Sequence, residues 1–207
     1  MLVGTLRSIY RYPTKSLRGE ALDVIAVDAG GLAGDRRSAL IAGDADPRAG
    51  KTYRGKEDDR LHLVASLDEA LALAPTAHAI EDDEGFFDDA PVSLILDRWL
   101  DGVSEYVGYR VEFERFRPNF YVESAPGISF NEDDLTGREL QLGEVTLRVR
   151  YPIERCVVTT YDPHGGERDP RVLRYVAQAR ATWMGIYCDV PRAGTARTGD
   201  SLELIER

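Results

Sequence analysis

The chain has 207 residues, of which 43% are hydrophobic and 30% are charged, and its formal net charge at pH 7 is −10. This length allows one large domain or two small ones, and the composition is that of an ordinary globular protein. A nucleic-acid-binding protein is excluded because it needs a broad basic surface, whereas residues 61–114 hold 13 acidic and only two basic side chains.

Membrane insertion and secretion are also disfavoured. The apolar residues never form a run of roughly 18, which is the length that a transmembrane helix needs. Arg7, Arg11 and Lys15 interrupt the first apolar stretch, which argues against a signal peptide. Two cysteines, Cys156 and Cys188, are too few for a disulfide framework. We therefore expect a cytoplasmic protein with neither a membrane nor a nucleic acid as its partner.

The pattern of apolar residues predicts a chain that is rich in strands. Alternation of apolar and polar residues, or a short apolar run between turn residues, is typical of a strand. The strands are expected over residues 2–10, 21–28, 38–42, 92–96, 111–116, 119–122, 140–142, 145–151, 156–160, 186–190 and 201–205.

Three helices and two long loops are predicted between these strands. The expected helices cover 66–74, 97–107 and 170–181, and the expected loops cover 43–60 and 81–89. Ser66 and Glu69 form a capping-box pattern at the start of the first helix. Asp97 is expected to cap the second helix, and Pro170 lies in the first turn of the third, where its missing N–H is tolerated.

Short strands separated by Gly, Pro and Asp turns favour a β-barrel. The chain shows no alternation of strands and helices and no Gly-rich dinucleotide motif, so a Rossmann fold has no support. The predicted fold class is mixed α+β, with a strand-rich barrel and a few peripheral helices.

Three short segments carry the chemical signal. Residues 155–163 read Arg-Cys-Val-Val-Thr-Thr-Tyr-Asp-Pro, and a cation beside a cysteine favours the thiolate that binds a soft metal or attacks an electrophile. Residues 10–19 read Tyr-Arg-Tyr-Pro-Thr-Lys-Ser-Leu-Arg-Gly, and residues 115–119 read Arg-Phe-Arg-Pro-Asn. No His, Cys and Asp residues have zinc-ligand spacing, so a hydrolytic zinc site is not expected.

Together with residues 31–36 and 194–200, these segments in this order resemble the MOSC family, named after the C-terminal domain of molybdenum cofactor sulfurases. The family includes the mitochondrial amidoxime-reducing components and bacterial relatives. The resemblance covers nearly the whole chain and implies a MOSC-like β-barrel. It divides the chain into an N-terminal β-barrel-like segment, an acidic connecting segment with a helix, and the MOSC core, at 1–60, 61–110 and 111–207. We expect the three to form one compact unit.

The resemblance implies a bound molybdenum cofactor, a Mo-pyranopterin, with Cys156 as the thiolate ligand of the metal. Arg155 and Thr160 become catalytic residues that support this cysteine. The residues implied to bind the cofactor are Lys15, Ser16, Arg36, Arg117, Asn119 and Thr159. Lysine and arginine suit its phosphate group. The implied function is an oxidoreductase that reduces small N-hydroxylated or N-oxygenated compounds. Because no iron–sulfur cysteine cluster is present, we expect a separate electron-donor protein.

Two other functions use the same thiol and stay open. Cys156 would serve as a sulfur carrier or lyase nucleophile without a metal, since the family is fused elsewhere to pyridoxal-phosphate cysteine desulfurases. Pyridoxal phosphate itself is not expected in this chain. The protein would otherwise be a non-catalytic carrier of molybdenum cofactor. Glu154 stands where relatives often have a small or hydroxyl residue, which puts a carboxylate near the metal centre, and His164 is expected to be a loop residue.

Overall fold

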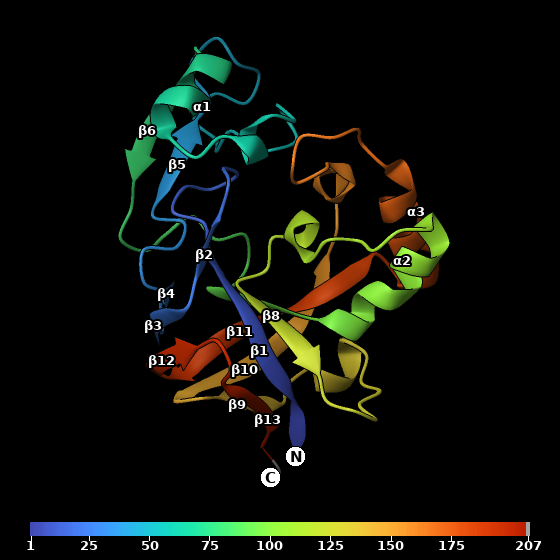
Figure 1. The fold of residues 1–207 in the computed structure, drawn as a ribbon. Helices are drawn as coiled ribbons and strands as arrows, with labels where there is room; N and C mark the ends of the chain where they lie inside the picture. The colour runs from blue at the N-terminus through green and yellow to red at the C-terminus, as the bar shows by residue number, and fades with distance from the viewer. Residues whose placement is uncertain (206–207) are drawn as a thin grey trace.

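The computed structural model describes residues 1–205, and within them seven strands close into a barrel. These strands are β1 (Leu2–Arg11), β7 (Val92–Leu96), β8 (Phe120–Ser124), β9 (Glu139–Leu142), β10 (Val145–Glu154), β11 (Trp183–Arg192) and β13 (Ser201–Leu204), as Figure 1 shows. Their order around the ring is β13-β9-β10-β11-β7-β8-β1, and β1 pairs with β13 to close it. Neighbours run antiparallel except β7 and β8, which are parallel. The predicted strand-rich, barrel-containing fold class is confirmed.

Shorter elements surround the barrel. The short strands are β2 (Glu20–Leu22), β3 (Val24–Asp28), β4 (Gly31–Leu32), β5 (Ser38–Ile41), β6 (His78–Glu81) and β12 (Gly194–Arg197). The α-helices are α1 (Leu67–Leu73), α2 (Asp101–Val107) and α3 (Pro170–Ala179). The 3₁₀ turns are η1 (Leu61–Leu63), η2 (Asp97–Leu100), η3 (Phe113–Phe116), η4 (Asp133–Leu135) and η5 (Val157–Thr160). Within the described part of the chain, no helix has the length and apolar character that crossing a bilayer requires.

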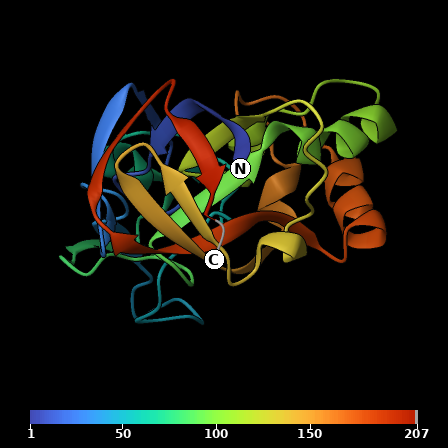
Figure 2. The same ribbon diagram turned by 90° about the horizontal axis from the view of Figure 1, so that it is seen from below.

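The helices lie at two separate places on the barrel. Helices α2 and α3 lie side by side (Figures 1 and 2), and Tyr106 of α2 contacts Tyr175 of α3 with 5.4 Å between ring centroids. Helix α1 belongs to an upper lobe, residues 38–81, together with β5 and β6. A small hydrophobic cluster around Leu40 and Leu61 packs this lobe, separately from the large core of the barrel.

Several strand and helix predictions are confirmed in detail. In β10 the apolar Leu147 and Val149 are buried and Arg148 is exposed, because successive side chains point to opposite faces of a sheet. At the start of α1 the Ser66 hydroxyl accepts a hydrogen bond from the Glu69 backbone N–H, and the Glu69 side chain bonds back to Ser66. The alternation and the capping box are therefore reliable local signals here.

Two predicted strands are wrong. Residues 113–116 and 157–160 form the 3₁₀ turns η3 and η5 instead. Residues 111–116 alternate apolar and charged side chains, and residues 156–160 form a short run that begins with apolar residues, and neither pattern alone distinguishes a strand from a buried turn. Both turns have local backbone hydrogen bonds, and Arg115, buried in η3, donates to backbone carbonyls at the end of η5, so a side chain and not a strand partner joins the two segments.

Smaller corrections concern element boundaries. Asp97 does not cap α2, which begins at Asp101. Its carboxylate accepts hydrogen bonds from the backbone N–H groups of Arg98 and Ser124 and ties η2 to β8. The predicted loop over 81–89 begins in the last residue of a strand, because β6 pairs with β5, and β12 is a further strand that the pattern missed.

One sheet draws strands from all three predicted segments. The first segment supplies β1, the second supplies β7, and the remaining barrel strands lie after residue 110. The two ends of the barrel seam also meet, because the N-terminal amine of Met1 donates to the Leu204 carbonyl at 2.8 Å. The boundaries at 60 and 110 stay a prediction about how the chain is organised.

Candidate functional site

A cavity of about 300 Å³ lies where the N-terminal segment, η3 and η5 meet. Its wall contains seven of the nine residues that the sequence singled out. They are Lys15, Ser16, Arg36, Arg117, Arg155, Cys156 and Thr159. Residues more than 140 positions apart in the chain are thus brought together in one place.

Cys156 lies at the start of the η5 turn, just after β10 ends. Its backbone is extended, and both the backbone N–H and the hydroxyl of Thr159 donate to its carbonyl, at 3.1 and 3.0 Å. The residue is exposed and its sulfur is not in a disulfide. The turn therefore places the exposed thiol at the cavity wall.

Arg155 holds this cysteine segment against two other elements. Its guanidinium donates to the carbonyl of Met184 in β11 at 2.6 Å and to that of Phe116 in η3 at 2.8 Å. Burial lowers the pKa of Arg155 to about 10. A third nitrogen, Nη2, is buried and has no hydrogen-bond partner within residues 1–205. A buried donor without a partner destabilises the folded protein, so this nitrogen is available to donate a hydrogen bond to a ligand near Cys156.

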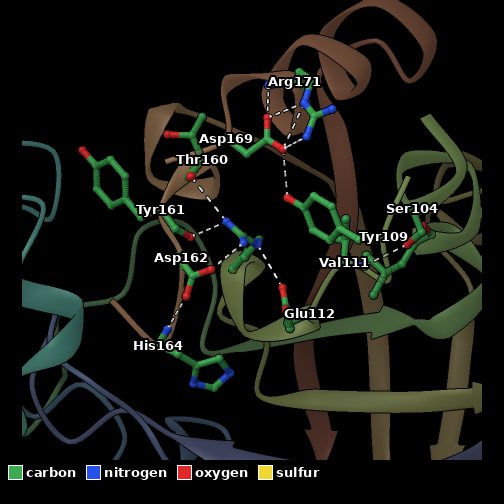
Figure 3. Close-up of polar contacts among 12 residues, drawn as sticks. Ser104, Tyr109, Val111, Glu112, Thr160, Tyr161, Asp162, His164, Asp169 and Arg171 are labelled. Atoms are coloured by element: carbon green, nitrogen blue, oxygen red, sulfur yellow. Dashed lines mark hydrogen bonds and ion pairs between the residues drawn. The ribbon is translucent and has the colours of Figure 1, made fainter. Parts of the chain in front are cut away.

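Arg115 holds the far side of the same turn. Figure 3 shows the carbonyls of Thr160 and Tyr161 and the carboxylates of Glu112 and Asp162 facing a common centre. The buried Arg115 guanidinium occupies that centre and donates to them over 2.8 to 3.3 Å. The Arg-Phe-Arg-Pro-Asn and cysteine motifs are therefore parts of one hydrogen-bonded unit.

Three cavity residues have a strained backbone. Ser16, Arg36 and Arg117 have positive φ angles of 71°, 51° and 51°, in the left-handed region that favours glycine. This conformation costs an L-residue roughly 1–2 kcal/mol. Such strain concentrates at functional sites because the surrounding structure must enforce it. Here the turns direct two guanidinium groups and a hydroxyl into one cavity.

The two guanidinium groups share an aromatic support. The Arg117 guanidinium lies 4.2 Å and that of Arg36 lies 4.9 Å from the ring centroid of Tyr12. Burial, and then the neighbouring Arg36, lowers the pKa of Arg117 to about 10. Arg36 is paired with the fully buried Asp35 carboxylate, whereas the Arg117 guanidinium donates to the Leu17 carbonyl at 2.7 Å and makes no ion pair within residues 1–205. Two cations this close are stabilised by an anion between them.

A MOSC domain model matches residues 81–203, which is more than half of the chain. The chain belongs to the MOSC domain family. Similar curated proteins include mitochondrial amidoxime reducing component 2 of Rattus norvegicus, 29% identical over 142 residues, and of Homo sapiens, 29% identical over 126 residues. The matches cover 62% and 55% of this chain but only 41% and 36% of those relatives. The family resemblance predicted from the motifs is confirmed.

Solved structures support the MOSC fold. The YuaD protein from Bacillus subtilis superposes with a TM-score of 0.60 at 19% identity, covering 98% of this chain and 96% of that one. A hypothetical protein superposes with a TM-score of 0.53 at 15% identity, covering 100% and 69%. At these identities the likeness concerns the fold alone.

The cavity of this MOSC protein is strongly cationic. Seven lysine and arginine side chains line it against two carboxylates, although the whole chain carries a net charge of −10. The cations are Lys15, Arg36, Arg54, Lys56, Arg115, Arg117 and Arg155, and the carboxylates are Asp88 and Glu154. Such a donor set suits a ligand that carries phosphate. Within the described residues, no group of three or more His, Cys, Asp and Glu side chains is placed to hold a metal ion.

Several cavity residues were not predicted from the sequence. Arg54 and Lys56 come from the loop 43–60, where the Gly55 N–H donates to the Ser16 hydroxyl at 3.1 Å. Asp88 comes from the acidic stretch and pairs with Lys15 at 2.6 Å. The Arg-Gly-Lys string was a usable signal in that loop, whereas nothing in the acidic stretch distinguished Asp88 from its neighbours.

Two predicted site residues do not line the cavity. Asn119 is buried, and its side-chain oxygen accepts hydrogen bonds from the backbone N–H and the hydroxyl of Ser93, both at 3.0 Å. Thr160 is also buried, and its hydroxyl donates to the Val157 carbonyl at 2.7 Å. Both hold neighbouring elements in place, so any effect on a ligand would be indirect. Their predicted roles in catalysis and cofactor binding stay predictions.

Proposed function

We propose that this MOSC protein binds a molybdenum cofactor in the 300 Å³ cavity and reduces small N-hydroxylated or N-oxygenated compounds. The observation that carries the proposal is the pairing of seven cationic side chains with one exposed thiol in the same cavity. Relatives named amidoxime reducing components support the reaction class, and the MOSC family is associated with molybdenum cofactor.

The cationic residues would hold the phosphate of the cofactor. Lys15 would supply a compact charge, and the planar guanidinium groups of Arg36 and Arg117 would donate hydrogen bonds to the phosphate. The Asp88 carboxylate is paired with the Lys15 ammonium at 2.6 Å. A phosphate that binds Lys15 would therefore replace one anion with another. The strained turns keep these donors in position before the ligand arrives.

Cys156 would be the protein ligand of the metal. A soft thiolate suits molybdenum, and the turn leaves this sulfur exposed at the cavity wall. When bound, the cofactor supplies the two-electron chemistry of the reaction. Removing the oxygen of an N–OH group breaks the N–O bond, consumes two electrons and two protons, and releases water and the N–H compound. We infer that a separate electron-donor protein supplies the electrons.

The proposal is tested by measuring molybdenum and pterin in purified protein from a host that makes the cofactor. Wild type should hold near-stoichiometric amounts, and Cys156→Ala and Lys15→Ala should hold much less. Cys188→Ala and Lys51→Ala are matched controls, because Cys188 is buried in β11 and Lys51 is exposed outside the cavity. Metal-free and pterin-free wild-type protein would overturn the proposal.

A second candidate function rests on the exposure of the thiol. An accessible cysteine beside buried arginine can carry sulfur as a persulfide without any metal. Metal-free protein is incubated with a small-molecule persulfide, which transfers its outer sulfur to the Cys156 thiolate and leaves as a thiol. Mass spectrometry should then show one added sulfur on Cys156 and none in Cys156→Ala. Protein that holds cofactor but turns over no N-hydroxylated compound would instead indicate a cofactor carrier.

A further inference from the structure

A second cavity of about 450 Å³ lies beside the first and has a different chemistry. Its wall includes three aromatic side chains, Tyr151, Trp183 and Tyr187, and three acidic ones, Asp88, Asp89 and Glu154. Among the described residues, no lysine or arginine lines this wall. Asp88, Glu154 and Tyr187 line both cavities, so the two are adjacent.

The register of β10 and β11 builds this second cavity. Tyr151 is paired with Tyr187 across the ladder, and Glu154 is paired with Trp183. Residues three apart in a regular strand point to opposite faces, so Tyr151 and Glu154 would not share a cavity. The alternation of β10 is interrupted here, because Tyr151 and Glu154 are exposed while Pro152 and Ile153 between them are both buried, and both exposed side chains line the second cavity. The register with β11 also shifts between Pro152 and Glu154, which is typical of a β-bulge in β11.

Gly185 makes this bulge possible. Its φ angle of +88° is rarely adopted by residues with a side chain, and an added Cβ would lie 3.0 Å from the Leu94 carbonyl oxygen. A bulge beside a functional site commonly redirects a side chain toward that site. Trp183 and Glu154 line the cavity beside this bulge, and Tyr151 and Tyr187 make an edge-to-face contact with 6.1 Å between ring centroids.

Two of the three carboxylates are available to a ligand. Asp88 is paired with Lys15, but neither Asp89 nor Glu154 makes an ion pair within residues 1–205. The neighbouring Arg150 is already engaged, since it pairs with Asp189 and donates to the backbone carbonyl of Asp89 at 2.6 Å. The cavity therefore combines uncompensated negative charge with aromatic faces.

We propose that the second cavity is the substrate subsite and that it selects organic cations with an aromatic or flat apolar body. Aromatic faces attract a cation through the ring quadrupole, and carboxylates add direct Coulomb attraction. Glu154 lies two residues before Cys156 along extended chain, which places their Cα atoms about 7 Å apart. A cation held at Glu154 thus lies next to the thiol, and charge separates the anionic cofactor from the cationic substrate.

The role as a substrate subsite rests on the proposed function, but the binding of a cation does not. Trp183 lies in the cavity wall and reports binding through its fluorescence, while the other tryptophan, Trp99, is buried in the barrel core. The purified protein is titrated with benzylamine, with benzyl alcohol as a neutral probe of similar size and with benzoate as an anionic probe. Calorimetry of the same titrations gives an independent dissociation constant.

Benzylammonium should bind at least about tenfold more tightly than benzyl alcohol, and benzoate should bind most weakly. Glu154→Gln should reduce the preference for the cation about fivefold or more. Adding Asp89→Asn to this variant should reduce the preference further. Glu105→Gln on α2 makes the same change in net charge at an exposed position far from the cavity, and should change nothing. These residues are on the surface, so the variants are expected to fold.

Equal affinity for the three probes, or an unchanged preference in Glu154→Gln, would overturn this inference. Neither result depends on molybdenum content, so it leaves the proposed function standing. Conversely, a protein that holds no cofactor but prefers benzylammonium as described would lose the proposed function and keep the cation site.

Discussion

The two cysteines lie in regions that are held together by different kinds of interaction. Cys188 is buried in the middle of β11, which pairs through its backbone with β10 on one side and β7 on the other. Cys156 begins a turn that lies outside the barrel ladder and depends on the side chains of Arg115 and Arg155. Many backbone hydrogen bonds stabilise the ladder together, whereas the position of the turn depends on hydrogen bonds from two guanidinium groups. The turn gains an accessible thiol and becomes sensitive to single substitutions.

The largest expected difference between the two regions is in thiol reactivity. In native protein Cys156 should react with a disulfide reagent at least about 10³-fold faster than Cys188, because Cys188 reacts only when the barrel opens. Burial also raises the pKa of the Cys188 thiol. A reagent assay should give one fast equivalent, with the second released by denaturant. Cys156→Ala should remove the fast phase; two fast equivalents would contradict the comparison.

The next largest effect is expected at the centre of the turn. Arg115→Met removes hydrogen bonds to two carbonyls and leaves the Asp162 and Glu112 carboxylates without their cation, which should cost about 3–5 kcal/mol of unfolding free energy. Urea unfolding measures this loss. Arg148→Met is the control on the ladder, because that arginine is half exposed and should change stability by less than about 1 kcal/mol. Equal losses would show that the turn does not depend on one side chain.

The bulge in β11 lies between the ladder and the cysteine turn, because Gly185 faces both the Leu94 carbonyl and the Arg155 guanidinium. We expect the ladder to be most sensitive to substitution there. Gly185→Ala introduces a Cβ at a positive φ angle, 3.0 Å from both the Leu94 carbonyl oxygen and Arg155 Nη2. We expect a loss of about 2–3 kcal/mol, from strain plus the close contact. Gly199→Ala also has a positive φ but meets nothing within 4 Å, so it isolates the strain alone, about 1–2 kcal/mol. A loss in Gly185→Ala no larger than this control would exclude a steric role for the bulge.

The smallest expected effect concerns the link between the turn and α3. The Asp169 carboxylate accepts hydrogen bonds from Arg171 and from the Tyr109 hydroxyl (Figure 3). These contacts, with Arg171 first, lower the pKa of Asp169 to about 2. A carboxyl whose pKa is lower in the folded state stabilises the protein above its unfolded pKa, and this stabilisation disappears as the pH falls through the folded value. Asp169→Asn keeps an N-cap side chain but should remove about 1–2 kcal/mol near neutral pH. The difference from wild type should close between about pH 4 and pH 2. A difference that is independent of pH would contradict this origin.

Local patterns in the sequence predicted much of the barrel because each strand carries its own alternation. The capping box of α1 and the buried face of β10 follow from neighbouring residues alone, and so does the strand position of Cys188. The strands predicted over 111–116 and 156–160 are wrong because both segments form turns with local backbone hydrogen bonds, and Arg115 then joins the two turns through its side chain. Nothing within either run shows that Arg115 of η3 will reach the carbonyls of η5.

The sequence by itself determined the family, the cysteine and most of the cationic residues of the cavity, because motifs keep their chemistry wherever the chain places them. Tertiary structure alone decided that Asn119 and Thr160 are buried supports, and that Arg54, Lys56 and Asp88 reach the cavity. It also decided that Glu154 and Trp183 share an acidic, aromatic cavity. Those outcomes depend on contacts between segments that are far apart in the chain, such as the ion pair of Asp88 with Lys15 and the pairing of β10 with β11. No periodicity within one segment contains that information.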